Sequence, residues 1–301
     1  MNRGIVLCLC VLSCAVSGWA EPGVLETVDQ LTGENKLRES RVVLEKALTK
    51  ATVPEEQSEV LWRLSRLTYL ETEQKKQTRE DSSRLLKAYE QGADLAARAL
   101  AANPRSPEAF FWRASNWGSW AQAKGGLDAL GKATAARDDL AAAIRLKPDF
   151  GPACYVLGLL YGSLPGWPLS FGNKEFGISL LRRAMDLAEK PEHTLGYRLN
   201  LAVFLWERNW SAAVRGEKRK FMSRSHDEKK LMDEKYCFYE GKADFSREVL
   251  SGGRTLQDLS DREEARAQLA FVEEQAERLL TKSEDVEKIK EAVASIRDSL
   301  R

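Results

Sequence analysis

Residues suited to catalysis are few, and their spacing matches no catalytic motif. The chain has two histidines, His193 and His226, and five cysteines, of which only Cys154 and Cys237 lie beyond residue 20. Neither histidine stands near a nucleophile in the sequence, so we predict exposed or capping roles for both. Cys154 lies in the apolar run ACYVLGLLY, where a buried small side chain is expected. Two cysteines do not make a disulfide framework.

Cofactor and metal motifs are also absent. The sequence contains no GxGxxG, Walker, G-x-S-x-G or HExxH pattern and no metal-ligand spacing. Gly125-Gly126 has no preceding strand, so it does not predict a phosphate site. The acid pairs Asp138-Asp139 and Glu263-Glu264 fall on predicted helices and are expected to face solvent. We therefore predict no catalytic site, no metal and no cofactor, and hence not an enzyme.

Tryptophans are more informative, because large aromatic side chains often anchor interfaces. Trp112, Trp117 and Trp120 crowd one predicted helix, and Trp117 is expected in a hairpin core. Trp167 differs, since it stands between Gly166 and Pro168 in a predicted loop. Its ring either projects as an interface anchor or folds back onto its own hairpin, and the sequence leaves both open.

The elements that must position these residues are helices punctuated by prolines. Asn103-Pro104 and Lys147-Pro148 each end a helix-like segment, and an aromatic-rich helix begins a few residues later. This cadence is typical of stacked helical hairpins. We predict an all-α, tetratricopeptide-like helical-hairpin solenoid with elongated inter-helix loops and a helical C-terminal extension.

The tetratricopeptide pattern places large, small and aromatic residues where paired helices cross, because a small side chain lets two backbones approach. The predicted hairpins are Trp62 and Tyr69 with 88–102; Phe110, Ala114 and Trp117 with Ala136, Leu140, Ala143 and Leu146; Cys154, Leu157, Gly158 and Tyr161 with Leu181 and Ala184; and Leu201, Ala202 and Trp206 with Ala212 and Ala213. Pro104 to Pro148 spans 44 residues, against about 34 in an ordinary repeat. The excess is expected in loops at 121–131 and 165–172.

The concave face is where binding is expected. Stacked hairpins line that face with their first helices, and the register places Phe111, Tyr155 and Leu159 there, with Trp206 joining them. With Trp167 these residues form the predicted partner- or ligand-binding set. Such an apolar groove fits either a partner helix or an apolar ligand, and the sequence does not decide between them.

The N-terminus is typical of an export signal. Arg3 precedes an apolar run at 5–16, and Gly18-Trp19-Ala20 offers small residues before Glu21. We predict a signal peptide over 1–20. A competing pattern at 11–14 resembles a bacterial lipoprotein signal, which would end before Cys14 and lipidate that residue. Either route predicts an exported, periplasmic protein, soluble or lipid-anchored to the envelope.

Composition divides the remaining chain at residue 222. Residues 21–33 are expected to be a tether or short lead-in, 35–222 the solenoid, and 223–301 a helical extension. Ser260 and Glu263 form a capping box, and Ala265, Leu269, Val272, Ala276 and Leu279 follow at helical spacing. This stripe favours packing against the solenoid end over a free coiled coil.

Charge excludes one class of partner. The chain has 46 basic and 45 acidic residues and a net charge of +1, so it lacks the broad positive field of nucleic-acid-binding proteins. The basic run at 215–220 is diluted by Glu217, Asp227 and Glu228. It is predicted to be a solvated helix face, with contact to acidic lipid or an acidic partner as the alternative.

A family resemblance adds a role. The stretched repeats, the exported start and the loop PGWPLSFGNK, Pro165 to Lys174, resemble the T-component of bacterial TRAP-type transporters over roughly residues 58–222. The resemblance implies a periplasmic lipoprotein that associates with the transporter's substrate-binding component. Animal regulators of microtubule dynamics have similar stretched repeats, but the bacterial-looking signal argues against their compartment.

The sequence therefore predicts a noncatalytic envelope scaffold for a protein partner, most specifically a TRAP solute-binding protein. Two alternatives stay open: a general envelope-assembly scaffold, and a carrier of an apolar small ligand in the concave groove. Self-association into a homo-oligomer is compatible with all three.

Overall fold

The structure is a computed structural model, and it describes residues 23–77, 81–126, 129–245, 255–280 and 283–299. The predicted signal segment and Cys14 lie outside these residues. The described part contains thirteen α-helices and no strand. None of its helices has the length and apolar character needed to cross a membrane.

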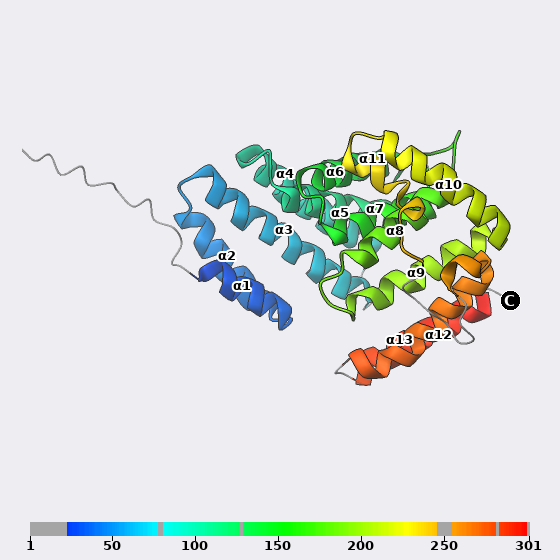
Figure 1. The fold of residues 1–301 in the computed structure, drawn as a ribbon. Coiled ribbons are helices and arrows are strands. Elements are labelled where there is room, and N and C mark those ends of the chain that lie inside the picture. Colours follow the sequence, from blue (N-terminus) through cyan, green and yellow to red (C-terminus); the bar gives the residue numbers. More distant parts are fainter. Residues whose placement is uncertain (1–22, 78–80, 127–128, 246–254, 281–282, 300–301) are drawn as a thin grey trace, which may run out of the picture.

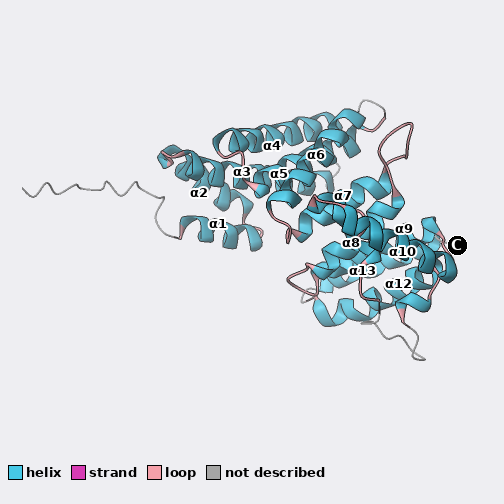
Figure 2. Cartoon of the chain, turned by 45° about the horizontal axis from the view of Figure 1, so that its top comes forward, coloured by secondary structure: helices cyan, strands magenta, loops and turns pink. Residues whose placement is uncertain are grey.

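The helices stack as antiparallel hairpins, with α1 and α2 at one end and α12 and α13 at the other (Figures 1 and 2). Their bounds are α1 (Val24–Gly33), α2 (Leu37–Lys50), α3 (Pro54–Gln77), α4 (Ser82–Ala102), α5 (Pro107–Lys124), α6 (Leu130–Leu146), α7 (Gly151–Ser163), α8 (Lys174–Asp186), α9 (His193–Arg208), α10 (Ala212–Glu228), α11 (Met232–Tyr236), α12 (Asp261–Leu279) and α13 (Ser283–Ser299). Two short 3-10 helices, η2 (Tyr239–Gly241) and η3 (Leu256–Asp258), precede α12. The all-α tetratricopeptide-like solenoid predicted from sequence is confirmed.

Side-chain caps and a proline define the N-terminal ends of several of these helices. Ser106 accepts a hydrogen bond from the backbone N–H of Ala109, and Pro107 occupies the first turn of α5, where no N–H is needed. Asn173 caps α8 through the N–H of Phe176. The predicted capping box is confirmed, because Ser260 and Glu263 each accept a hydrogen bond from the other's backbone N–H.

Small residues allow the closest helix crossing. A side chain at Gly177 of α8 would lie 2.9 Å from both the carbonyl oxygen of Gly158 and the backbone of Gly162, on α7. At Gly158 it would lie 3.1 Å from the carbonyl oxygen of Gly177. Backbones this close leave no room for a Cβ. The third hairpin therefore depends on glycine, as the predicted register at Gly158 indicates.

Two expectations about the helices and their loops are wrong, and a third is met. The expected lead-in before residue 33 is largely helix α1, whose Val28 is fully buried against α2 and α3. In the second hairpin the extra length lies mainly in longer helices, since α5 has 18 residues and α6 has 17. The third hairpin does carry the expected loop, which joins α7 to α8.

The fourth hairpin has a different partner from the one predicted. Helix α9 packs against α12, while α10, which carries Ala212 and Ala213, packs on η2 and α11. The end of the solenoid is thus covered by the C-terminal helices, as the apolar stripe predicts. Ala265, Leu269 and Val272 of α12 and Val293 of α13 are buried against α8 and α9. The helix that pairs with α9 at the end of the solenoid is therefore α12, which begins about fifty residues after α9 ends.

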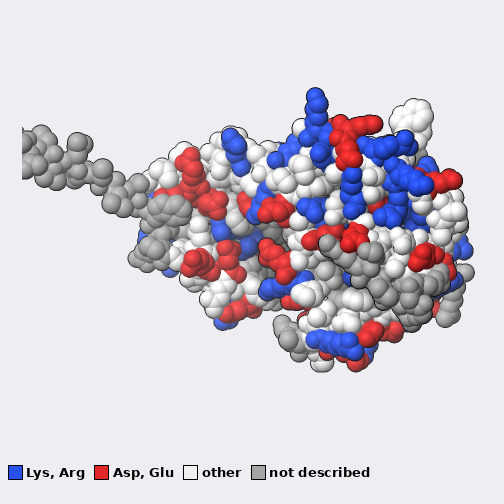
Figure 3. Space-filling view, in the orientation of Figure 1, with Lys and Arg blue, Asp and Glu red and all other residues white. Residues whose placement is uncertain are grey.

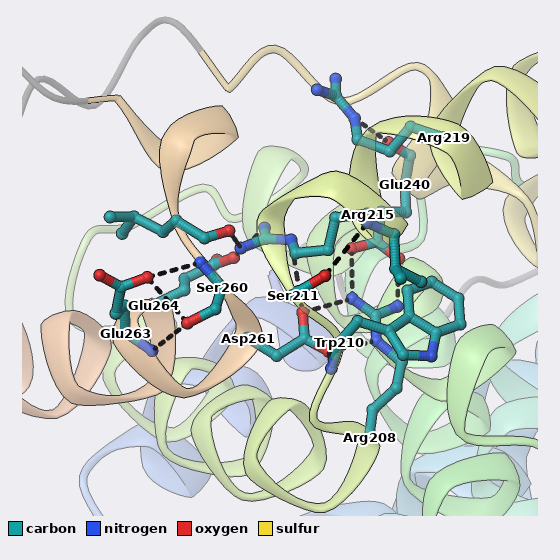
Figure 4. A network of polar contacts seen from close by, with 12 residues as sticks. Arg208, Trp210, Ser211, Arg215, Arg219, Glu240, Ser260, Asp261, Glu263 and Glu264 are labelled. Atoms are coloured by element: carbon teal, nitrogen blue, oxygen red, sulfur yellow. Dashed lines mark hydrogen bonds and ion pairs between the residues drawn. The ribbon is translucent and has the colours of Figure 1, made fainter.

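A closed ring of buried charges joins the C-terminal helices to the solenoid (Figure 4). Arg182 of α8, Arg208 of α9 and Arg215 of α10 alternate with Glu240 of η2 and with Asp261 and Glu264 of α12. Each carboxylate in this charge ring pairs with two arginines, and every one of the six side chains is at most 5% exposed. The alternation balances three buried positive charges with three buried negative charges.

The charge ring overturns two solvent-exposure predictions. Glu264 is fully buried although its pair with Glu263 was expected to face solvent, and Arg215 is buried although it begins the run predicted as a solvated face. Asp139 is also buried, because Arg113 donates two hydrogen bonds to its carboxylate at 2.7 and 2.6 Å. In each case a residue of opposite charge elsewhere in the sequence supplies the partner that makes burial of a charge tolerable.

Candidate functional site

One hollow of the described structure is a groove of about 770 Å³. The first helices of three successive hairpins, α3, α5 and α7, line it together with the start of α6 and the beginning of the α7–α8 loop. Its volume falls in the range of small-ligand pockets, and its lining is mostly apolar. The groove therefore occupies the face on which the repeat register predicts binding.

The apolar wall comes from α6 and α7. Tyr155 and Leu159 lie on it, so the structure brings two of the predicted binding residues together. Tyr155 is held from behind, since its ring stacks on Tyr197 at 4.3 Å between centroids and its hydroxyl accepts a hydrogen bond from Asn200 Nδ2 at 3.0 Å. Burial, reinforced by Tyr197, raises the pKa of Tyr155 to about 12. The phenol is therefore a neutral group at physiological pH.

The polar wall of the groove consists of Glu73, Lys76, Ser115, Ser119 and Gln122, all from α3 and α5. Glu73 accepts a hydrogen bond from the hydroxyl of Tyr89 at 2.6 Å, and Lys76 lies 3.8 Å from Glu73 and donates to Gln122 at 3.0 Å. Ser115 and Ser119 add hydroxyl groups to this wall. A ligand here meets an apolar surface on one side and a carboxylate, an ammonium group and hydroxyls on the other.

Sequence reasoning missed the polar wall. The apolar pattern of the first hairpin ends near Tyr69, whereas α3 continues to Gln77. The available signal was spacing: Glu73 and Lys76 stand one and two turns beyond Tyr69, on the same face of the helix. Tyr69 itself lines the groove and packs against Trp112, with 5.6 Å between ring centroids.

Two predicted binding residues lie away from the groove. Phe111 is buried in the hairpin core, where its ring contacts Trp112 and Phe150, so the concave exposure expected for it is wrong. Trp206 of α9 lies beneath two guanidinium groups of α12, those of Arg262 at 4.6 Å and Arg266 at 5.2 Å from its ring. It belongs to the contact with the C-terminal helices.

Trp167 lies in the loop that joins α7 to α8 (Figure 1). Its side chain is 90% exposed and that of Leu169 is 65% exposed, so the ring does not fold back onto its own hairpin. Backbone hydrogen bonds close the base of the loop: Gly172 N–H donates to Pro165 at 3.0 Å and Asn173 N–H donates to Tyr161 at 2.7 Å. A fixed base thus presents two large apolar side chains to solvent.

The loop also borders a second hollow of about 540 Å³ against α6. Phe171 supports it from below, because its ring packs edge-on against Tyr161 and lies 4.7 Å from the Arg137 guanidinium. Leu169 and Leu130 line both this hollow and the main groove. The loop therefore forms one rim of the groove.

The histidines and cysteines of the described part lie apart from the groove. No group of three or more His, Cys, Asp or Glu among these residues is placed to hold a metal. His193 is exposed, and burial lowers the pKa of His226, which lies beside Asp227. Burial raises the pKa of Cys154 and of Cys237 to about 12, so both thiols stay protonated.

Comparison with known proteins supports the fold. Residues 24–162 match the family described as regulator of microtubule dynamics protein 1-3. The solved structure of TTC0263, a thermophilic tetratricopeptide protein of Thermus thermophilus, has a TM-score of 0.52 at 18% identity, covering 92% of this chain and 98% of that one. PilF of Pseudomonas aeruginosa has a TM-score of 0.42 at 16% identity, with 89% and 95% covered. A search of curated proteins found no match.

The likeness to TTC0263 shows a tetratricopeptide-like architecture. The family match covers α1 to α7 and so includes the helices that line the groove. The C-terminal helices and the charge ring lie beyond it.

Proposed function

We propose that this protein is a noncatalytic scaffold that binds a segment of a partner protein in the groove between α3, α5 and α7. The observation that carries the proposal is the pairing of the apolar wall, with Tyr155 and Leu159, and the polar wall, with Glu73 and Lys76, on the concave face. An amphipathic helix fits such a groove, since its apolar side chains face one wall and its polar ones the other. Trp167 at the rim supplies an additional anchor.

The partner we propose is a solute-binding protein of the TRAP class, bound in the bacterial cell envelope. The loop from Pro165 to Lys174, the stretched repeats and the export-type N-terminus support this assignment. Export places the mature chain in the periplasm, either free after cleavage before Glu21 or anchored through lipidated Cys14. The intact mass of the mature protein distinguishes the two routes.

The experiment is crosslinking and recovery of the native protein from its own cells, followed by identification of bound proteins. We compare the unaltered chain with a groove variant, Leu159→Asp, and a loop variant, Trp167→Ser. The matched control is Val42→Ser, since Val42 on α2 is 50% exposed and far from the groove. Recovery of a solute-binding protein should persist in the control and be lost in the groove variant.

Other outcomes contradict parts of the proposal. Equal recovery with Leu159→Asp would refute the groove as the binding site. Recovery of unrelated envelope-assembly proteins alone would refute the TRAP partner and favour a general assembly scaffold. Recovery of tubulin would refute the envelope placement.

A second candidate function is transport of an apolar small ligand in the same groove. Its supporting observation is the groove's volume of about 770 Å³ with a mostly apolar lining, which suits a compact ligand as well as a helix. Organic extraction of the purified protein, followed by mass spectrometry, should then release a ligand that is absent from Tyr155→Ala. Extracts identical for both proteins would exclude the carrier.

A further inference from the structure

Helix α10 has an inverted arrangement of charged and apolar side chains. Its inner face buries Arg215 in the charge ring, and Arg219 donates hydrogen bonds to the carbonyl oxygens of Glu240 and Ala243. Its outer side leaves Phe221 53% exposed and Val214 38% exposed. A helix that only closed the solenoid would bury its phenylalanine and expose its arginines. Contact with water alone does not explain why an arginine is buried and a phenylalanine is exposed on the same helix.

Cations surround the exposed apolar side chains. Lys220 and Arg224 lie on one flank of Phe221 on the surface of α10 and Lys218 lies on the other flank, and none of the three forms an ion pair with any residue that the structure describes. The same character continues in the turn after α10, where Lys230 is exposed and Leu231 is 43% exposed. Figure 3 shows Lys and Arg gathering over α10 and α11. We call these residues, from Val214 to Leu231, the basic–apolar face.

Acidic residues only partly offset this charge. Asp227 is exposed but pairs with Lys242 at 2.7 Å, which leaves Glu217 and Glu228 as the exposed acids of α10 that form no ion pair with a described residue. The unpaired cations on the basic–apolar face outnumber them. The whole chain is nearly neutral, so this local excess is a property of one face rather than of the composition.

We propose that the basic–apolar face binds an anionic lipid bilayer. Phe221, Val214 and Leu231 would enter the headgroup region while the surrounding lysines contact lipid phosphates, as in amphipathic helices that lie in a membrane interface. Flexible lysines around isolated apolar side chains suit a lipid surface, because lipid headgroups are mobile and need no complementary shape on the protein. A carboxylate-bearing protein would favour a cluster of arginines with fixed geometry. The inference is independent of what the groove binds.

The test uses the full chain and vesicles of phosphatidylcholine alone or mixed equally with phosphatidylglycerol. Lys220→Glu combined with Arg224→Glu should weaken co-sedimentation with the anionic vesicles by about tenfold or more, because two attractive charges become repulsive. The matched control is Lys46→Glu with Lys50→Glu, two exposed lysines of α2 whose reversal changes net charge equally. All variants keep the same N-terminus, so attachment through residues 1–20 is common to them.

A second measurement identifies the contacting residue directly. A photo-reactive phenylalanine analogue at position 221 should crosslink to lipid in anionic vesicles, whereas the same analogue at position 42 should not. Equal weakening by the α2 control pair would overturn the proposal, since attraction would then depend on net charge alone. Absence of lipid crosslinks at 221, or their loss on adding soluble polyglutamate, would also overturn it and indicate an acidic protein partner.

Discussion

Gly177 allows α7 and α8 to approach closely, so a substitution at this residue tests the packing directly. We expect Gly177→Ala to destabilise the protein by about 1–3 kcal/mol, because the added methyl group meets backbone atoms that no rotamer change can move. The closest of these lie 2.9 Å from the new Cβ. Urea unfolding followed by circular dichroism measures the change in free energy.

Gly196 of α9 is the matched control for this substitution. It is also helical, but no atom lies within 4 Å of its added Cβ. Gly196→Ala should leave stability unchanged or raise it by up to about 1 kcal/mol through helix propensity. Equal destabilisation by both substitutions would show that the close crossing of α7 and α8 is not the cause of the stability lost in Gly177→Ala.

Individual groove residues were predictable only where repeat spacing defines them. Tyr155 and Leu159 follow from the register of α7, whose first-helix pattern is the clearest in the chain. Phe111 does not, because it follows Phe110 directly and the pattern cannot decide which neighbour turns inward. Glu73 was missed for another reason: the apolar stripe ends near Tyr69, so only the spacing of Glu73 one turn further places it on the same face.

At the scale of elements, the charge ring couples α8, α9, α10 and α12. We expect Arg182→Met to destabilise the protein by about 3–5 kcal/mol, because Glu240 and Glu264 would each lose one of two partners inside the fold. The same exchange at Arg137 is the control, since its partner Asp138 is 63% exposed. Arg137→Met should cost only about 0–1 kcal/mol. Urea denaturation of the two variants compares them.

The charge ring also predicts a direction of pH dependence. Burial alone would raise the pKa of Glu240, but Arg208 and Arg182 hold the pKa down to about 2, and Arg182 and Arg215 likewise lower that of Glu264. A carboxylate with a depressed pKa contributes stability above its unfolded pKa of 4.5 and loses that contribution as the pH falls. We therefore expect the free energy of unfolding to fall from about pH 4.5 towards pH 2.

Glu240→Gln tests the origin of that slope. The variant should have lower stability at neutral pH and a shallower decline between pH 4.5 and pH 2, because one titrating carboxylate is gone. Unfolding measured across this pH range in both proteins decides the matter. A slope identical to that of the unaltered chain would place the acid sensitivity elsewhere.

Elements were predicted well where apolar spacing is local and poorly where partners are distant. The stripe on α12 and its capping box can be found within twenty residues. The charge ring cannot, since Arg182 and Glu264 are 82 positions apart and each looks like an ordinary surface charge in its own helix. For the same reason α10 was the expected partner of α9, when the partner is α12.

At the scale of the whole molecule, α12 and α13 are part of the solenoid's core rather than an appended module. Ending the chain after residue 254 would expose Leu195, Leu201 and Leu205 of α9 and remove two carboxylates of the charge ring. We expect that truncation to aggregate or to melt far below the intact chain. Size-exclusion chromatography and thermal melting check this.

A shorter truncation provides the comparison. Ending the chain after Leu280 removes α13, of which only Val293 is buried among the described residues, and keeps the charge ring complete. This variant should remain monodisperse with a modestly lower melting temperature. If it aggregated or melted as early as the longer truncation, the loss of α13 rather than of the charge ring would explain the loss of stability.

The charge ring also imposes an order on biosynthesis. The chain is made from its N-terminus, so the arginines at 182, 208 and 215 emerge before the carboxylates at 240, 261 and 264. Until the last of these arrives, the half-made protein carries three cations with no place to be buried and an open apolar end. Residues 240–264 therefore complete the burial of these arginines, and a chain that ends before them cannot close the ring.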